Sequence, residues 1–263
     1  MKVPNFKTDE GSILYKDTVG RLISPRVAGI LLEQAKLQIE GLKARRVLDL
    51  ACGPGTLTLP LALGNPELDI TAVDSSMSMV ALASAEASRL GVSNIQFEQM
   101  DARQISVAPG SFDLVLCNLA FPFFAKPEQS MAEVFSAIRP GGAACFTVPG
   151  RKTWDEFFAA AADTLGEMIS VARPFLTKFT QVAALPGAMM AVGFEQVTRE
   201  QTLLPFYFAN GQSVLNFFSE LFHLLDYATP DMKSEVADAI DRNHPDGFTM
   251  HYEAVLLTAQ RPS

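Results

Sequence analysis

The chain has 263 residues, a formal net charge of −8 at pH 7 and only three histidines. This acidic balance argues against a protein that follows a nucleic-acid backbone by electrostatic attraction, so we expect no nucleic-acid partner. The three cysteines, Cys52, Cys117 and Cys145, lie in apolar segments, which predicts buried thiols in a reducing compartment. The first residues lack the apolar core of a secretory signal, and no charge-free apolar run reaches about 18 residues. These features predict a cytoplasmic location and no membrane partner.

Helix and strand patterns alternate through the first 150 residues. Ser24 is predicted to cap a helix over residues 24–39. Further helices are expected over residues 75–91 and 129–142, the first of them ended by Gly91. The expected strands are short apolar segments at residues 45–52, 68–74, 94–101, 112–118 and 143–150. Strands that alternate with helices form parallel crossover units, so the pattern predicts a doubly wound, mostly parallel α/β sheet.

Two amphipathic helices are expected after residue 150. The first covers residues 153–169, where Thr153 and Glu156 form a capping-box pair. The second covers residues 213–227 and carries a stripe of phenylalanine and leucine side chains. We interpret both as helical cap insertions on the sheet.

Two late strands, at residues 194–206 and 251–260, bring the expected sheet to seven strands. No repeat or linker-like composition marks a domain boundary. We therefore interpret residues 1–150 as N-terminal helices and a ligand-binding core. Residues 151–263 are interpreted as the remainder of the same α/β domain, with the helical cap insertions and the last two strands.

The stretch VLDLACGPGT, residues 47–56, ends an apolar strand in a glycine turn. Gly53 and Gly55 allow a ligand to approach the backbone without meeting a β-carbon. Asp74 closes the second expected strand, where a carboxylate can accept hydrogen bonds from both hydroxyls of a ribose. Asp101 closes the third, where it could accept from an adenine amino group. A tight turn without a ligand would explain the glycines alone, but the acids at successive strand ends favour an adenosine-containing ligand.

These motifs resemble the class I S-adenosylmethionine-dependent methyltransferases of the small-molecule type. The resemblance covers roughly residues 42–150 and rests on five motifs in order: VLDLACGPGT, ITAVDSS, FEQMDA, FDLVLCNLAF and IRPGGAACF. One departure is Ala51, which stands where the first glycine of the family's acid-x-Gly-x-Gly-x-Gly pattern would stand. The resemblance implies a Rossmann-like sheet and S-adenosylmethionine as the cofactor. The cofactor-binding residues it implies are Tyr15, Asp49, Ala51, Gly53, Gly55, Asp74, Ser75, Asp101, Ala102, Asn118 and Leu119.

Other ligands of glycine loops fit the sequence less well. The loop contains no lysine, which argues against a nucleoside triphosphatase, whereas S-adenosylmethionine has no phosphate and Asp49 suits its ammonium group. A dinucleotide enzyme is an alternative, because Gly53, Gly55 and Asp74 approximate its fingerprint. However, Thr58 occupies the position of its third glycine, where close helix packing leaves no room for a side chain.

The acceptor must be predicted from residues outside the cofactor motifs. Nucleic-acid and protein-amide methyltransferases have a similar site, with an Asn/Asp-Pro-Pro-aromatic motif at the end of the fourth strand. Here Leu119 and Ala120 follow Asn118 in place of the two prolines. The aromatic cap segments favour a small, largely apolar acceptor, methylated on oxygen, nitrogen or carbon, in a pocket that the cap closes. The substrate-binding candidates are Phe121, Phe123, Trp154 and Phe217. The alternatives are a macromolecular acceptor and a protein that binds S-adenosylmethionine without methylating.

His251 and His223 are the candidate catalytic bases, and each could instead be an ordinary packed or rim histidine. Tyr15 is expected to close over the methionine end of the cofactor, although it could be a surface tyrosine. The cysteines and histidines lack metal-ligand spacing, so no metal site is expected. The sequence leaves the oligomeric state open.

Overall fold

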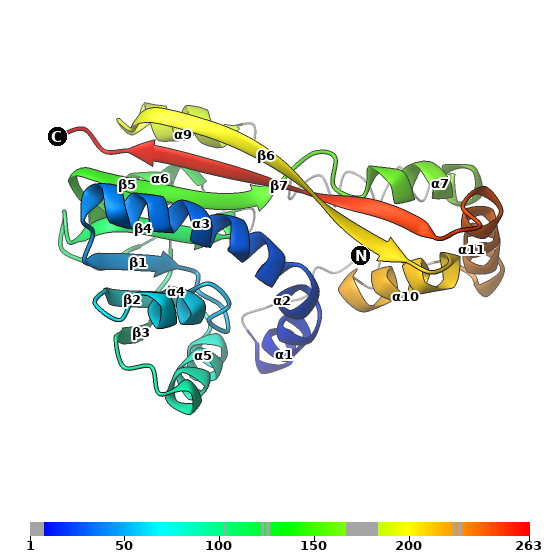
Figure 1. Cartoon of the computed structure of the whole chain (residues 1–263), viewed down its shortest axis with the longest axis horizontal. Coiled ribbons are helices and arrows are strands. Elements are labelled where there is room, and N and C mark those ends of the chain that lie inside the picture. The colour runs from blue at the N-terminus through cyan, green and yellow to red at the C-terminus, as the bar shows by residue number, and fades with distance from the viewer. Residues whose placement is uncertain are drawn as a thin grey trace. The chain divides into compact units, whose positions relative to one another are not determined.

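The fold is built on a seven-stranded sheet with the order β3-β2-β1-β4-β5-β7-β6 (Figure 1). The computed structural model describes residues 8–102, 104–121, 124, 127–166, 184–222, 225 and 228–263. The strands are β1 (Arg46–Leu50), β2 (Asp69–Asp74), β3 (Ile95–Gln99), β4 (Phe112–Asn118), β5 (Ile138–Pro149), β6 (Glu195–Phe208) and β7 (Phe248–Gln260). Parallel pairing joins β1 to β2 and β4, β2 to β3, and β4 to β5. The predicted fold class is therefore confirmed.

β7 runs against the direction of β5. Arg261, just after the end of β7, exchanges backbone hydrogen bonds with Gly141 and Gly142 near the start of β5. The end of one strand thus lies beside the start of the other, which makes this pair antiparallel.

Helices connect the strands and flank the sheet. Their bounds are α1 (Asp9–Asp17), α2 (Val19–Leu22), α3 (Ser24–Leu42), α4 (Thr58–Gly64), α5 (Met77–Leu90), α6 (Pro127–Ala137), α7 (Asp155–Leu165), α9 (Leu185–Ala191), α10 (Gly211–Phe222) and α11 (Pro230–Asn243). Gly91 ends α5 in the left-handed conformation, as predicted. Within the described residues, no helix is both long and apolar enough to cross a membrane.

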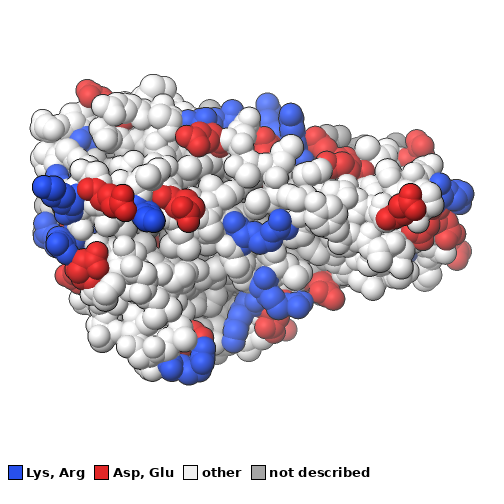
Figure 2. All heavy atoms as spheres, in the orientation of Figure 1, with Lys and Arg blue, Asp and Glu red and all other residues white. Residues whose placement is uncertain are grey.

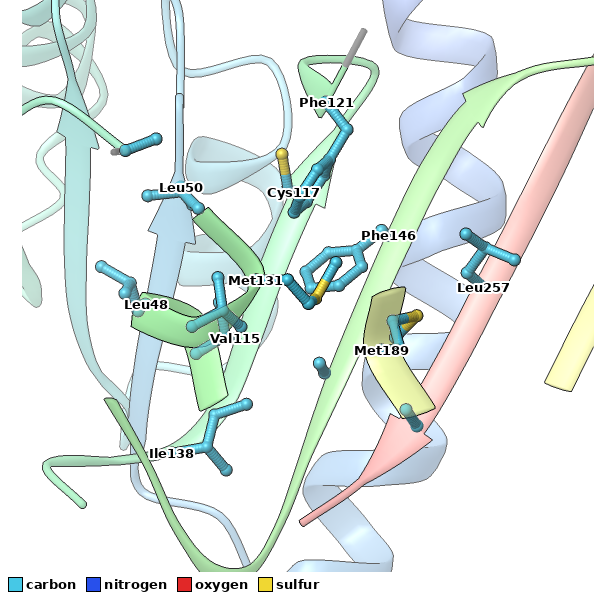
Figure 3. Close-up of a cluster of buried hydrophobic side chains, with 14 of the residues drawn as sticks. Leu48, Leu50, Val115, Cys117, Phe121, Met131, Ile138, Phe146, Met189 and Leu257 are labelled. Atoms are coloured by element: carbon cyan, nitrogen blue, oxygen red, sulfur yellow. The ribbon is translucent and has the colours of Figure 1, made fainter. Parts of the chain in front are cut away.

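Two apolar layers cover the central strands, one on each face of the sheet. Leu114 and Leu116 of β4 pack with residues of α3 and α4. Val115 and Cys117, which point to the opposite face, pack with residues of α6 and α9 (Figure 3). β4 is therefore buried on both faces, which is why its sequence is a nearly continuous apolar run.

Residue contacts divide the chain into two compact units. We call the first the sheet unit, and its described residues fall within 4–148, 182–200 and 255–263. The second is the aromatic unit, whose described residues fall within 149–166 and 201–254. The aromatic unit includes α7, α10 and α11 together with the ends of β6 and β7.

Several local predictions are wrong in detail. Ile23, not Ser24, is the N-cap residue of α3, and the Ser24 hydroxyl is used instead in a tertiary hydrogen bond with Asn118. The capping box of α7 does not form, because the Thr153 hydroxyl bonds the backbone of β7 and Glu156 bonds His251. In both cases a partner distant in sequence takes the side chain that local spacing had assigned to a cap.

The helix predicted over residues 129–142 ends at Ala137, and its last residues belong to β5. α11 was not predicted, although Thr229 accepts a hydrogen bond from the backbone N–H of Met232 as its N-cap. Pro230 at the first helical position was the sequence signal for this helix start.

Candidate cofactor site

The glycine loop follows β1 at the carboxyl end of the parallel strands, where open α/β sheets bind ligands. Positive φ values occur at Ala51 (57°), Gly53 (55°) and Gly55 (87°). A β-carbon at Gly55 would lie 3.0 Å from the Leu59 side chain and 3.3 Å from Ala83. Gly55 therefore lets the loop pack against α4 and α5, and Gly53 holds a turn that side chains resist. Alanine at position 51 adopts the left-handed conformation in place of glycine.

Asp74, at the end of β2, fixes the loop through both of its carboxylate oxygens. Its Oδ2 accepts a hydrogen bond from the backbone N–H of Gly53 at 2.9 Å, and its Oδ1 accepts one from Ser76 at 2.9 Å. A carboxylate accepts hydrogen bonds at both of its oxygens. This geometry suits a ligand that presents two hydroxyls.

Asp49 is the most unusual residue of the site. It is fully buried in β1, and the Thr58 hydroxyl of α4 donates to its Oδ2. Among the described residues, none donates a hydrogen bond to its Oδ1. Burial raises the pKa of Asp49 to about 7, the Thr58 hydrogen bond opposes this rise, and the charge of Asp74 adds to it. A buried carboxylate with an unused oxygen is a receptor for a cation or a hydrogen-bond donor.

A chain of polar side chains ties the N-terminal helices to the ends of β4 and β5. Tyr15 of α1 shares a hydrogen bond with Ser24, and the amide of Asn118 donates to the Ser24 hydroxyl at 3.0 Å. The Thr147 hydroxyl donates to the Asn118 carbonyl oxygen at 2.6 Å. Tyr15 thereby lies over the loop, where its ring would be 3.9 Å from a β-carbon at Gly53. Burial raises its pKa, which keeps the phenol neutral.

The remaining predicted cofactor residues lie at the ends of neighbouring strands. Leu119 follows β4 with a φ of 60° and is almost buried, as is Ala102 after β3. Ser75 follows Asp74, and its carbonyl accepts from Gln99. Asp101 accepts a backbone hydrogen bond from Gln104 through its own carbonyl. Binding roles for these residues stay predictions.

The aromatic substrate candidates occupy two different cores. Phe121 is 2% exposed in the sheet unit, where its ring centroid is 4.6 Å from that of Phe146. Trp154 is 1% exposed in the aromatic unit, with Phe217 and Tyr252 at centroid distances of 5.3 and 5.5 Å. Phe123 lies outside the described residues. Packing alone accounts for the burial of the three described rings, and contact with an acceptor stays a prediction.

His251 is held by a carboxylate in the aromatic unit. Its Nδ1 lies 2.6 Å from Glu156 Oε1, and its backbone N–H donates to Glu156 Oε2 at 3.1 Å. Burial alone would raise the pKa of Glu156, but hydrogen bonds from His251 outweigh it and lower the pKa. This contact favours the tautomer that leaves Nε2 as the acceptor. A role as base stays a prediction, and His223 lies outside the described residues.

Two contributors were missed by sequence reasoning. Thr58 was considered only as a departure from a glycine pattern, and Ser24 only as a helix cap, yet both donate or accept within the site. No spacing rule links them to Asp49 and Asn118, because the fold makes these contacts. Among the described residues, no cluster of three His, Cys, Asp or Glu side chains could hold a metal ion.

A family model described as a methyltransferase domain matches residues 42–198. Trans-aconitate 2-methyltransferase of Deinococcus radiodurans is 36% identical over 104 residues, which are 40% of this chain and 38% of that protein. Release factor glutamine methyltransferase of Bordetella pertussis is 32% identical over 114 residues, 43% of this chain and 41% of that protein. The chain thus spans less than half of these curated relatives.

Solved structures share the fold at low sequence identity. The YcgJ protein of Bacillus subtilis has a TM-score of 0.60 and 16% identity, covering 90% of this chain and 99% of that chain. Phosphoethanolamine N-methyltransferase 2 of Haemonchus contortus, in complex with S-adenosylhomocysteine, has a TM-score of 0.59 and 17% identity. The match covers 98% of this chain and 58% of that chain. The [4+2]-cyclase SpnF has a TM-score of 0.57 and 19% identity, and the match covers 99% of this chain and 98% of that chain.

Proposed function

Because this chain belongs to the methyltransferase-domain family, we propose that it binds S-adenosylmethionine and methylates a small, largely apolar acceptor. The observation that carries the proposal is the meeting of three features at the ends of β1 and β2. These are the fully buried Asp49 with an unused oxygen, the turn at Gly53, and the Asp74 carboxylate. S-adenosylmethionine supplies a methyl group on a positively charged sulfur, and alignment of the acceptor is then the main requirement.

The protein's residues match the chemistry of this cofactor group by group. The two oxygens of Asp74 would accept from the ribose hydroxyls, and Asp101 with the backbone of Ala102 would read the adenine. Asp49 would face the ammonium group, and the tight turn at Gly53 leaves backbone accessible to the methionine end. The proposed fit would give a partner to Asp49 Oδ1, which accepts no hydrogen bond from the described residues.

The hydrogen bonds that Asn118 already makes favour a small acceptor. They argue against an acceptor whose planar amide would be held by this side chain. Its amide nitrogen donates to Ser24 and its carbonyl oxygen accepts from Thr147, so both ends are already engaged. The face of the molecule seen in Figure 2 is consistent with this proposal, because acidic and basic side chains are interspersed on it. A nucleic acid would be expected to need a continuous basic stripe.

Two other functions keep a specific observation in their favour. The similarity to a release factor glutamine methyltransferase favours a protein acceptor. The similarity in fold to a cyclase favours a protein that uses this fold for other chemistry. Incubation with S-adenosylmethionine and either metabolite or protein extracts, followed by mass spectrometry for a methyl gain, separates methylated small molecules, methylated proteins and no methylation.

The cofactor assignment is tested with Asp74→Ala. Loss of hydrogen bonds to a charged group removes about 1.5–3 kcal/mol, so affinity for S-adenosylhomocysteine in isothermal titration should fall about 10–150-fold. Asp69→Ala is the matched control, because this exposed acid begins the same strand at its far end. Unchanged binding by Asp74→Ala would contradict the site, as would saturable binding of NADH in its place.

A further inference from the structure

Asp49 and Thr58 form a buried pair beneath the glycine loop. Thr58 is fully buried at the start of α4, and its hydroxyl points at Asp49 Oδ2. Among the described residues, Thr58 is the one that donates a hydrogen bond to this carboxyl group, and Oδ1 accepts none. An ionised carboxylate in this position would be desolvated and only half satisfied.

Within the part of the chain that the structure describes, the titratable groups that interact with Asp49 come from three other segments, and none of them is positively charged. Asp74 of β2 adds negative charge. Cys52 of the loop and Cys117 of β4 are buried thiols whose pKa values burial raises, so both remain neutral. The surroundings therefore disfavour a second negative charge at Asp49 until a cation arrives.

We propose that Asp49 carries a proton in the free protein and releases it to solvent when the cofactor's ammonium group binds, with Thr58 setting the pH of this exchange. The inference rests on the proposed function and adds proton coupling to it. The net charge around Asp49 then stays the same, because the proton leaves as the positively charged ammonium group arrives. Thr58 contributes because its hydroxyl stabilises the ionised carboxylate.

The size of the effect follows from linkage. Burial and Asp74 place the pKa of Asp49 at about 7 in the free protein. The bound ammonium lowers that pKa, so binding releases up to one proton below about pH 7 and none well above it. Affinity for the cofactor should then fall by up to about tenfold for each pH unit below about pH 7.

The coupling is measured by isothermal titration of S-adenosylhomocysteine in two buffers of different ionisation enthalpy, between about pH 5.5 and 8. This probe keeps the amino group and lacks the sulfonium charge. The buffer-dependent heat gives the number of protons released, and comparison with S-adenosylmethionine isolates the contribution of the sulfonium. Equal proton release by both ligands is expected.

Three variants separate the Asp49 proton from other titrations. Asp49→Asn should bind more weakly and lack the proton release, and its difference from the parent cancels the titration of the cofactor itself. Thr58→Val, which keeps the shape and removes the hydroxyl, should move the release to higher pH. Thr58→Ser keeps the hydroxyl and should behave like the parent. Carboxyl carbon NMR of the free protein should find a titration near neutral pH that Asp49→Asn removes.

The outcomes separate this inference from the function on which it rests. If neither ligand binds at any pH, the proposed function fails. If both bind without proton release, or if Asp49→Asn releases the same number of protons as the parent, the proton coupling alone is wrong. Release with S-adenosylmethionine only would overturn the assignment to the ammonium group.

Discussion

Asp49 shows how a single buried acid makes the stability of the free protein depend on pH. Its folded pKa of about 7 lies above the value of about 3.9 for an unfolded aspartate, so the folded state holds the proton more tightly. The stabilising contribution of this protonation is therefore complete below the unfolded pKa. It is lost as pH rises through the folded pKa. The proposed ligand binding favours the ionised form of Asp49, whereas the stability of the free protein favours the protonated form.

We predict that Asp49→Asn stabilises the free protein more at pH 8 than at pH 5. The amide cannot ionise, so the gain over the parent should grow by about 2–3 kcal/mol between these two pH values. Urea unfolding at both pH values measures it. Asp69→Asn, at an exposed acid of the same sheet, is the matched control and should change stability little. An equal effect of Asp49→Asn at both pH values would contradict a raised pKa.

At the scale of elements, the start of β4 is joined to β1 and β5 by one carboxylate. Asp113 Oδ2 accepts from the backbone N–H groups of Arg45 and Arg46 at 2.8 Å each, and Oδ1 accepts from Arg139 Nε at 2.5 Å. Burial alone would raise the pKa of Asp113, but these hydrogen bonds outweigh it and lower the pKa. The contact lies at the opposite strand ends from the glycine loop, so we assign it to stability.

We predict that Asp113→Asn lowers the unfolding free energy by about 2–3 kcal/mol at pH 7, because one donor loses its acceptor. A depressed carboxyl pKa stabilises above the unfolded pKa, and this contribution is lost as pH falls through the folded pKa. The difference between variant and parent should therefore shrink on acidification, as measured by urea unfolding from neutral to acid pH. Glu86→Gln, which breaks an exposed pair with Arg89, is the control and should change little. A constant difference at every pH would contradict the lowered pKa.

At the scale of the whole molecule, each of the two units contains buried aromatic side chains. The ring of Trp154 meets Phe206, Phe217 and Tyr252 at edge-on angles, all within the aromatic unit. The layers around β4 belong to the sheet unit, together with the candidate cofactor site. The rings around Trp154 and the candidate cofactor residues thus belong to different units, so we expect truncation of these rings to spare cofactor binding.

We predict that Trp154→Ala or Phe217→Ala lowers stability by about 3–5 kcal/mol and leaves affinity for S-adenosylhomocysteine within a few fold. Hydrogen exchange should rise within residues 149–166 and 201–254 before it rises in β1 or β4. Tyr207→Ala, an aromatic truncation on β6 at a side chain 77% exposed, is the matched control and should be near neutral. Normal stability with reduced acceptor turnover would indicate instead that these rings line an acceptor pocket.

The sequence by itself determined the alternation of strands and helices, the doubly wound sheet and the acids at the ends of its strands. Those features depend on local patterns, namely apolar runs, glycine turns and helix stops, and chain order then places the strand ends together. The tertiary structure alone decided which side chains satisfy one another. Thr58 faces Asp49, Ser24 serves Asn118 instead of a helix end, and Glu156 serves His251 instead of a capping box. Buried polar groups take the partners that burial brings within hydrogen-bond distance, and for Asp49 Oδ1 the described fold provides none.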